Sequence, residues 1–264
     1  MPLRRFYAPP EAFTPGRLHV ALSREESAHL SNVLRLREGT EVFVFDGEGH
    51  EFLCVVEPEP KRGARERVLR VVGLAEPPHK ESPLALTLAP AMLKGEKFDL
   101  VVQKATELGV SRIVPVETER AEVRLPPGGP EEPAAAKRVA RWRRIAVEAA
   151  KQTGRARVPQ VRAPIHLTTL LSEVAHDLDG AEELRLIFSE RDGRGLAETL
   201  GATGDEMRRV TALVGPEGGW EDAELEQATA AGWHAVTLGG RTLRAETASI
   251  VAAALLQHLC GDLK

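Results

Sequence analysis

The sequence predicts two domains of different fold class, a small β domain over residues 1–73 and an α/β domain over residues 84–264. Short β-rich runs separated by turns fill the first part, whereas strands alternate with helices in the second. The segment 74–83 between them is polar and rich in proline, as linkers are. Because strand–helix alternation favours parallel pairing, we expect a mostly parallel sheet covered by helices on both faces.

The β domain is predicted from three apolar runs and one helix. Residues 41–45 and 51–56 are joined by a turn with two glycines, which is typical of a β-hairpin, and residues 68–72 form a third strand. A helix is expected over residues 23–35, because its first residue is a serine followed three positions later by a glutamate, the pattern of a capping box. Strands at this spacing favour a small barrel.

The α/β domain is predicted from apolar runs and amphipathic segments in alternation. Strands are expected at residues 84–89, 112–116, 184–188, 210–214 and 235–238. Helices are expected at residues 94–108, 134–153, 221–231 and 247–259. The last helix is apolar nearly all round, so we expect it to be buried in the core or in an interface between subunits.

Composition and single residue types narrow the class of protein. Apolar residues make up 42% and charged residues 28% of the sequence, and no apolar run is long enough to span a membrane, so we expect a soluble cytoplasmic protein. Cys54 and Cys260 lie far apart in apolar surroundings and are expected to be reduced packing residues without a disulfide. The histidines lack the spacing of metal ligands, so no metal site is expected.

Three glycine-bearing loops follow expected strands, at residues 188–193, 214–220 and 238–247. The carboxyl ends of parallel strands meet at one edge of a sheet, where ligands bind. Each loop alone is equally well explained as a tight turn, but the three together favour a small-molecule site. The sequence has no phosphate-binding loop, no dinucleotide fingerprint and no nucleophile elbow, which argues against ATP, dinucleotides and serine-hydrolase chemistry.

The helix expected at 134–153 carries an unusual local charge. The whole sequence has a formal net charge of −4, yet residues 137–157 contain eight basic residues and a single acidic one. Such a segment is usually a solvated charged face. Because nearly all charges of this segment are positive, it favours contact with phosphate, and a basic patch can do so even on an acidic protein.

Several motifs are more specific than spacing alone. Leu-Val-Gly-Pro-Glu-Gly-Gly at residues 213–219 and Leu-Arg-Ala-Glu-Thr-Ala at residues 243–248 resemble the signature of the SPOUT methyltransferases. Gln-Lys-Ala-Thr-Glu-Leu-Gly-Val at 103–110, Glu-Ala-Ala-Lys-Gln-Thr-Gly-Arg at 148–155 and Arg-Arg-Phe at 4–6 extend the match over nearly the whole chain. With these motifs the chain resembles the bacterial RsmE family, the 16S ribosomal RNA uridine-N3 methyltransferases.

This resemblance implies a fold that the pattern alone does not. It implies an N-terminal PUA-like barrel that binds RNA, a C-terminal domain with a deep trefoil knot, and a homodimer that acts on the small ribosomal subunit. The pattern alone favours an unknotted sheet. The implied cofactor is S-adenosylmethionine, held without a metal. The implied cofactor residues are Phe188, Ser189, Glu190, Leu213, Val214, Gly215, Pro216, Glu217, Gly218, Leu238, Gly239, Leu243, Arg244, Glu246, Thr247 and Ala248.

Uracil N3 carries a proton, so its methylation needs a proton acceptor or a cation that stabilises the uracil anion. Our hypothesis is that Arg244 stabilises a uracil carbonyl and that Glu246 accepts the proton or orients the arginine. An equally open alternative is that Glu246 only caps the last helix. RNA contacts are expected from Arg4, Arg5, Arg35, Arg141, Arg144, Gln152 and Arg155. Two rival functions remain open, another SPOUT methyltransferase acting on ribose 2′-oxygen or another base, and a non-catalytic RNA-binding assembly factor.

Overall fold

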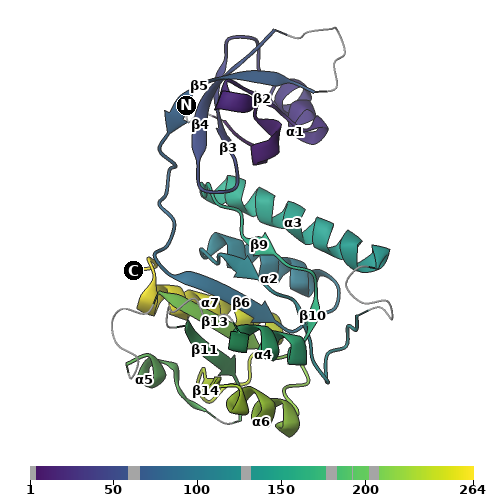
Figure 1. Ribbon diagram of the computed structural model, residues 1–264, viewed down its shortest axis with the longest axis vertical. Coiled ribbons are helices and arrows are strands. Elements are labelled where there is room, and N and C mark those ends of the chain that lie inside the picture. Colours follow the sequence, from purple (N-terminus) through teal and green to yellow (C-terminus); the bar gives the residue numbers. More distant parts are fainter. Residues whose placement is uncertain (1–3, 59–65, 126–131, 177–182, 192, 202–207) are drawn as a thin grey trace. The chain divides into compact units, whose positions relative to one another are not determined.

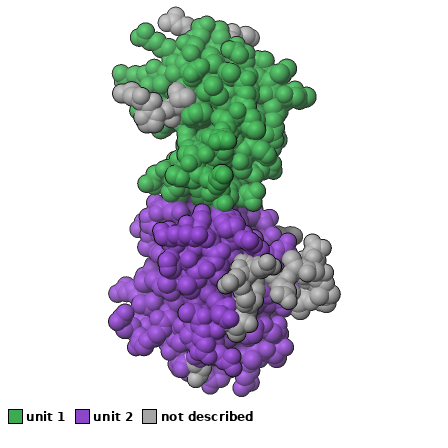
Figure 2. All heavy atoms as spheres, turned by 90° about the vertical axis from the view of Figure 1, so that its left-hand side faces the viewer, with its two compact units in different colours: residues 1–81, 147–158 green, residues 82–146, 159–264 purple. Residues whose placement is uncertain are grey.

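The structure, a computed structural model, describes residues 4–58, 66–125, 132–176, 183–191, 193–201 and 208–264. The chain divides into two compact units (Figure 2). Unit 1 comprises Met1–Glu81 and Val147–Val158, and unit 2 comprises Ser82–Ala146 and Pro159–Lys264. The expected domains of residues 1–73 and 84–264 therefore differ from these units, because residues 147–158 belong with the N-terminal part.

Unit 1 is built on a five-stranded sheet with the order β1-β3-β4-β5-β2. Its strands are β1 (Arg5–Tyr7), β2 (His19–Ala21), β3 (Glu41–Phe45), β4 (Glu51–Val56) and β5 (Val68–Ala75). The predicted hairpin is β3–β4, and the third predicted strand is β5, which runs into the expected linker. Phe6, Leu30 and Val44 are fully buried in the core of this unit. Strands β1 and β2 were not predicted, because three residues are too few to show an alternation.

The helix predicted after Ser23 exists but changes form along its length. Ser23 accepts a hydrogen bond from the backbone N–H of Glu26 at 3.2 Å and so begins α1 (Arg24–Ala28). A π-helical turn, His29–Val33, follows directly. Two short 3₁₀ helices, Pro10–Ala12 and Pro15–Arg17, come before α1 in the chain.

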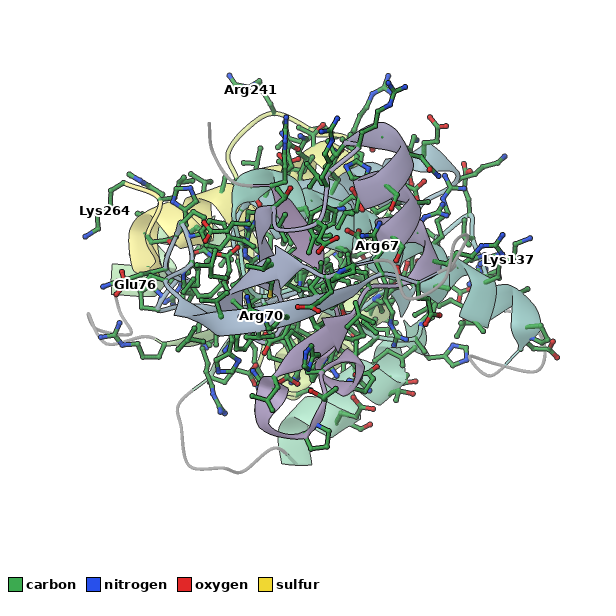
Figure 3. All side chains as sticks on the ribbon, turned by 90° about the horizontal axis from the view of Figure 1, so that it is seen from above. Arg67, Arg70, Glu76, Lys137, Arg241 and Lys264 are labelled. Carbon is green, nitrogen blue, oxygen red and sulfur yellow. The ribbon has the colours of Figure 1, made fainter. Side chains whose placement is uncertain are left out.

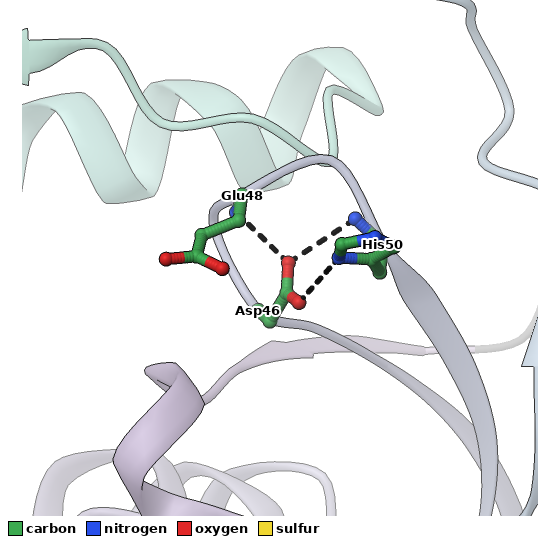
Figure 4. A group of neighbouring side chains, drawn as sticks. All are labelled: Asp46, Glu48 and His50. Carbon is green, nitrogen blue, oxygen red and sulfur yellow. Dashed lines mark hydrogen bonds and ion pairs between the residues drawn. The ribbon is translucent and has the colours of Figure 1, made fainter.

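The β3–β4 turn is organised by a buried carboxylate, Asp46. Its Oδ1 accepts the backbone N–H groups of Glu48 and His50 at 2.8 and 3.1 Å, and its Oδ2 lies 2.8 Å from Nδ1 of His50 (Figure 4). Arg17 pairs with the same Oδ2 at 3.3 Å. Both carboxylate oxygens of Asp46 therefore have polar partners, which explains why this acid is buried although charged groups are normally exposed.

Unit 2 contains a seven-stranded sheet in which every recorded pairing is parallel. Its order is β12-β14-β11-β13-β6-β7-β9. The strands are β6 (Ala85–Pro90), β7 (Arg112–Ile113), β9 (Gln160–Val161), β11 (Glu183–Phe188), β12 (Arg194–Gly195), β13 (Arg209–Val214) and β14 (His234–Thr237), and β8 (Val116–Glu117) pairs separately with β10 (Ile165–His166). The predicted parallel sheet is confirmed. The strand expected at residues 112–116 is shorter in the structure, where it is β7, and the two-residue strands β9 and β12 were not predicted.

The helices of unit 2 connect and cover these strands (Figure 1). They are α2 (Glu96–Glu107), α3 (Pro133–Thr153), whose last residues belong to unit 1, α4 (Leu167–His176), α5 (Leu196–Gly201), α6 (Asp222–Ala230) and α7 (Ala245–Cys260). Helix α7 packs against α2, β6 and β13, as expected for a largely apolar helix. It also presents the exposed leucines Leu255 and Leu259. No helix among the described residues is both long and apolar enough to cross a membrane.

Candidate active site

A pocket in unit 2 lies where three neighbouring strands end. Strands β14, β11 and β13 are adjacent and parallel, so their carboxyl ends lie at one edge of the sheet. The loops after these strands and the beginning of α7 enclose the pocket. It is lined by Phe188, Ser189, Glu190, Arg191, Val214, Gly215, Pro216, Gly219, Trp220, Thr237, Leu238, Gly239, Arg241, Leu243, Ala245 and Ala248.

The expected convergence of the three glycine-bearing loops is therefore present. Predicted cofactor residues that line the pocket are Phe188, Ser189, Glu190, Val214, Gly215, Pro216, Leu238, Gly239, Leu243 and Ala248. Those that do not line it are Leu213, Glu217, Gly218, Arg244, Glu246 and Thr247. Of the other lining residues, Thr237 lies outside the three predicted loops and was missed, whereas five lie within those loops but were not named as cofactor residues: Arg191, Gly219, Trp220, Arg241 and Ala245. Asp192, in the first loop, lies outside the described residues.

Trp220 holds two of the loops together, and sequence reasoning did not single it out. Its indole N–H donates to the backbone oxygen of Phe188 at 2.8 Å, and its own carbonyl accepts from Arg191 at 2.7 Å. A Cβ at Gly215 would lie only 3.0 Å from the Trp220 ring, so the loop needs glycine there. The sequence signal that could have indicated Trp220 is its position directly after the glycine-rich loop 215–219.

The third loop offers bare backbone to a ligand. Gly239 has a φ of +107°, which only glycine adopts readily, and nothing lies within 4 Å of the place where its Cβ would be. The neighbouring pocket walls Val214, Leu238 and Leu243 are apolar. A flat base needs apolar walls together with backbone donors and acceptors at its edges, and this pocket supplies both. Arg241, on the same loop, points outward (Figure 3).

Four charged side chains gather beside the pocket. Nζ of Lys97, in the first turn of α2, donates to Oε1 of Glu217 at 2.6 Å. Burial alone would raise the pKa of Glu217, but the hydrogen bond from Lys97, a hydrogen bond from the backbone of Glu217 itself and the charge of Lys97 together lower it. The pKa of Lys97 is raised, first by this hydrogen bond and further by the charge of Glu246, against the opposing charge of Arg244.

Glu246 is the unsatisfied member of this group. Its Oε2 is buried, and no hydrogen bond reaches that atom within the described parts of the chain. Helix α7 begins at the N-cap Arg244, whose side chain makes no capping hydrogen bond. A carboxylate oxygen without a partner next to an exposed arginine is suited to accept a proton while the cation stabilises a developing anion.

The expected RNA-binding residues fall into two groups. Arg4, Arg35 and Gln152 are exposed in unit 1, and Arg141 and Arg144 are exposed in unit 2. Arg141 also pairs with Asp99.

Arg5 and Arg155 serve the interior of unit 1 instead. Arg5 donates to Glu51 at 2.5 Å and to the carbonyl oxygens of Lys151 at 3.1 Å and Arg155 at 3.2 Å. Arg155 pairs with Glu81 at 2.6 Å, and its side chain is only 8% exposed. Sequence alone does not separate such an arginine from a surface one, and we remove these two from the expected RNA surface.

Comparison with known proteins identifies two domain families. Residues 80–257 match the family described as RNA methyltransferase domain, and residues 22–65 match the family described as RNA methyltransferase PUA domain. The ribosomal RNA small subunit methyltransferase E of Synechocystis sp. is 32% identical over 240 residues, which cover 91% of this chain and 73% of that protein. The protein of the same name from Bacillus subtilis is 29% identical, with 90% and 89% covered.

Solved structures agree with these matches. A ribosomal RNA small subunit methyltransferase E from Neisseria gonorrhoeae, bound to S-adenosylmethionine, is 34% identical with a TM-score of 0.81, and 99% of this chain and 100% of that chain are covered. A Legionella pneumophila protein in complex with the same cofactor is 31% identical with a TM-score of 0.82, and both chains are covered completely. The chain therefore belongs to the RNA methyltransferase family, in the group of the ribosomal RNA small subunit methyltransferase E proteins.

Proposed function

We propose that this protein transfers a methyl group from S-adenosylmethionine to N3 of a uridine in the 16S RNA of the small ribosomal subunit. The observation that carries the proposal is the pocket of glycine-rich loops, which lies beside the unpartnered carboxylate of Glu246. The relatives support the substrate class, because their name states that they methylate small-subunit ribosomal RNA.

The pocket suits the adenosyl part of this cofactor. Apolar walls at Val214, Leu238 and Leu243 are suited to pack against the adenine ring, and the open backbone at Gly239 allows close approach at its edge. Glu190, also in the lining, is suited to face the positive charge of the sulfonium. When bound, the cofactor supplies a methyl group that is already activated, so the protein needs to position the acceptor and remove a proton.

The chain's own residues divide that task. Glu246 accepts the proton from uracil N3, because its buried Oε2 has no competing partner in the described chain. Arg244, exposed at the start of α7, stabilises the negative charge that forms on a uracil carbonyl oxygen. Lys97 holds Glu217 and so fixes the loop between Pro216 and Gly219, two residues of the lining.

The proposal includes the finer fold features of this family. We infer a deep trefoil knot in unit 2; its support is the match of residues 80–257 to the RNA methyltransferase domain family. We infer a PUA-like barrel in unit 1, supported by a five-stranded sheet around one apolar core and by the bridge between Phe13 and Val20.

RNA binding and dimerisation complete the proposed function. The exposed residues Arg4, Arg35 and Gln152 of unit 1, with Arg141 and Arg144 of unit 2, contact RNA phosphates and sugars. The exposed Leu255 and Leu259 of α7 pack against a second copy of the chain, since such a face is otherwise costly to leave in water.

The deciding experiment is methyl transfer to unmethylated small ribosomal subunits with methyl-labelled S-adenosylmethionine, followed by mapping of the modified nucleotide. Label on N3 of one uridine is the expected result. Label on a ribose 2′-oxygen or another base assigns a different methyltransferase activity. Absence of label, with intact binding to the subunit, assigns a non-catalytic assembly factor and overturns the proposal.

A further inference from the structure

Unit 2 contains a second hollow, which the proposed cofactor pocket does not include. It has a volume of about 390 Å³ and lies between the segment after β6, the first turn of α2 and the middle of α3. A space of this size is within the range of small-molecule sites. Its lining, which we call the α2–α3 groove, consists of Met92, Leu93, Lys94, Gly95, Glu96, Phe98, Asp99, Val123, Arg138, Arg141 and Trp142.

The floor of the α2–α3 groove is apolar. Met92 and Phe98 are 1% exposed, and Leu93 and Trp142 are 5% exposed. The rings of Phe98 and Trp142 lie 4.3 Å apart between centroids, so the two aromatic side chains hold each other in place. Because so little of these four side chains is exposed, they close the bottom of the hollow as a rigid apolar floor and do not present an open aromatic face.

The rim of the groove is charged, with a positive excess. Lys94, Arg138 and Arg141 are cationic, and Glu96 and Asp99 are anionic. Asp99 pairs with Arg141 and so restrains the guanidinium group, which is still 55% exposed. An apolar floor under a cationic rim is complementary to a nucleotide, whose nucleobase is planar and whose phosphate is negative.

The groove is physically connected to the proposed cofactor pocket. The backbone N–H of Ala91, next to the groove residue Met92, donates to the carbonyl oxygen of Val214, which lines the pocket, at 2.8 Å. Lys97, between the groove residues Glu96 and Phe98, bonds to Glu217 of the loop that follows Val214. Groove and pocket therefore share one edge of the sheet and are joined by these two bonds.

We propose that the α2–α3 groove binds a nucleotide that flanks the target uridine in the RNA substrate. The base of this nucleotide enters the hollow above the apolar floor, beside the half-buried Val123, and its phosphate contacts Arg138 and Arg141. Proteins recognise single-stranded RNA by taking bases out of the stack in this way, and a second bound base fixes the position of the first. This inference rests on the proposed function, because it assumes an RNA acceptor at the neighbouring pocket.

One test fills the groove. Val123→Trp adds an indole to a half-buried lining residue, and Glu122→Trp adds the same group at the exposed neighbour outside the lining. We expect Val123→Trp to lower kcat/KM for small subunits by about tenfold or more, the effect of excluding one bound base. Calorimetry with S-adenosylhomocysteine should give the same affinity for the wild type and both variants. Equal kcat/KM in the wild type and Val123→Trp overturns the inference.

Charge provides a second comparison on the same helix. Arg138→Ala removes a cation from the rim, and Lys137→Ala removes one from an exposed neighbour that does not line the groove. We expect a larger loss of RNA affinity for Arg138→Ala. Equal losses for the two variants contradict a specific phosphate contact. A change of oligomeric state in Val123→Trp, with unaltered RNA binding, assigns the groove to a second copy of the chain and also overturns the inference.

Cross-linking locates the RNA without requiring turnover. A small-subunit RNA fragment with 4-thiouridine in place of uridine is irradiated on the wild-type protein, and the cross-linked peptides are identified by mass spectrometry. Cross-links to residues 92–99 or 138–142 support the inference, and cross-links confined to other segments overturn it. If the wild type transfers no methyl group, the proposed function fails, whereas the cross-link position still reports on the groove.

Discussion

Lys97 donates a hydrogen bond of 2.6 Å to Glu217, and this bond ties the first turn of α2 to the loop after β13. The pKa of Glu217 is lowered because the bond from Lys97, a hydrogen bond from the backbone of Glu217 and the charge of Lys97 together outweigh the effect of burial. A carboxyl group with a lowered folded-state pKa adds stability at pH values above its usual pKa of 4.5, and this contribution is lost as the pH falls through the folded-state value.

Substitution of Glu217 should therefore have a pH-dependent effect on stability. We expect Glu217→Gln to unfold at a lower urea concentration than the wild type near neutral pH, and the difference should shrink in acid below the usual carboxyl pKa. Urea denaturation at the two pH values measures it. Glu226→Gln, at an exposed acid of α6, is the control and should match the wild type throughout. A difference that grows on acidification contradicts the role of Lys97.

Substitution of Glu246 should affect turnover rather than binding. Glu246→Gln keeps the shape of the side chain but removes the proton acceptor, so kcat should fall by about 10² to 10⁴. The affinities for S-adenosylhomocysteine and for RNA should stay near those of the wild type. Single-turnover methyl transfer and calorimetry measure the two effects. Unchanged turnover with normal cofactor affinity excludes Glu246 as the base.

The exposed and the buried arginines should respond differently to truncation. Arg144 is exposed on α3, and Arg144→Ala should weaken RNA binding and lower the slope of log affinity against log salt concentration by about 1. Arg155→Ala breaks a largely buried pair with Glu81 and should destabilise the protein by about 3 to 5 kcal/mol. Salt titration and urea unfolding measure these effects. An unchanged slope for Arg144→Ala places the RNA surface elsewhere.

The leucines of α7 test the proposed dimer. Leu255 is 36% and Leu259 is 48% exposed in the single chain. Two charges there should repel across an interface between copies, so the double variant Leu255→Glu, Leu259→Glu should be monomeric by light scattering. Leu74→Glu changes a leucine of unit 1 that is 71% exposed and should leave the assembly unchanged. Equal assembly of the double variant and the wild type refutes α7 as the dimer face.

The sequence predicted long elements well and short ones poorly. The last three residues of β11 and of β13, 186–188 and 212–214, are all apolar and buried because both faces of a parallel sheet are covered, and such runs are visible without a structure. Strands β9 and β12 have two residues each, which is too short for any periodicity, and β7 is only the first part of the strand expected at residues 112–116. Helix α4 was also missed, as were α5 and the separate pair β8–β10.

The site was predictable where it depends on backbone and not where it depends on tertiary contacts. Gly215 and Gly239 could be identified from the sequence, since glycine marks places where backbone is approached closely. The bond from Trp220 to Phe188 and the pair Lys97–Glu217 join residues far apart in sequence, so no local pattern indicates them. The same holds for Arg155, whose partner Glu81 lies in a different part of the chain.

Strand β13 lies between β6 and β11, and Ala85 of β6 pairs with Arg209 of β13. Both β6 and β11 precede β13 in the sequence and are therefore synthesised first. Their edges that pair with β13 stay unpaired until β13 has been made. Chains grow at about 5 to 20 residues per second, and unpaired apolar edges invite aggregation during such a wait. The methyl donor cannot stabilise the nascent chain before α7 has been made, because the pocket includes residues of this last helix.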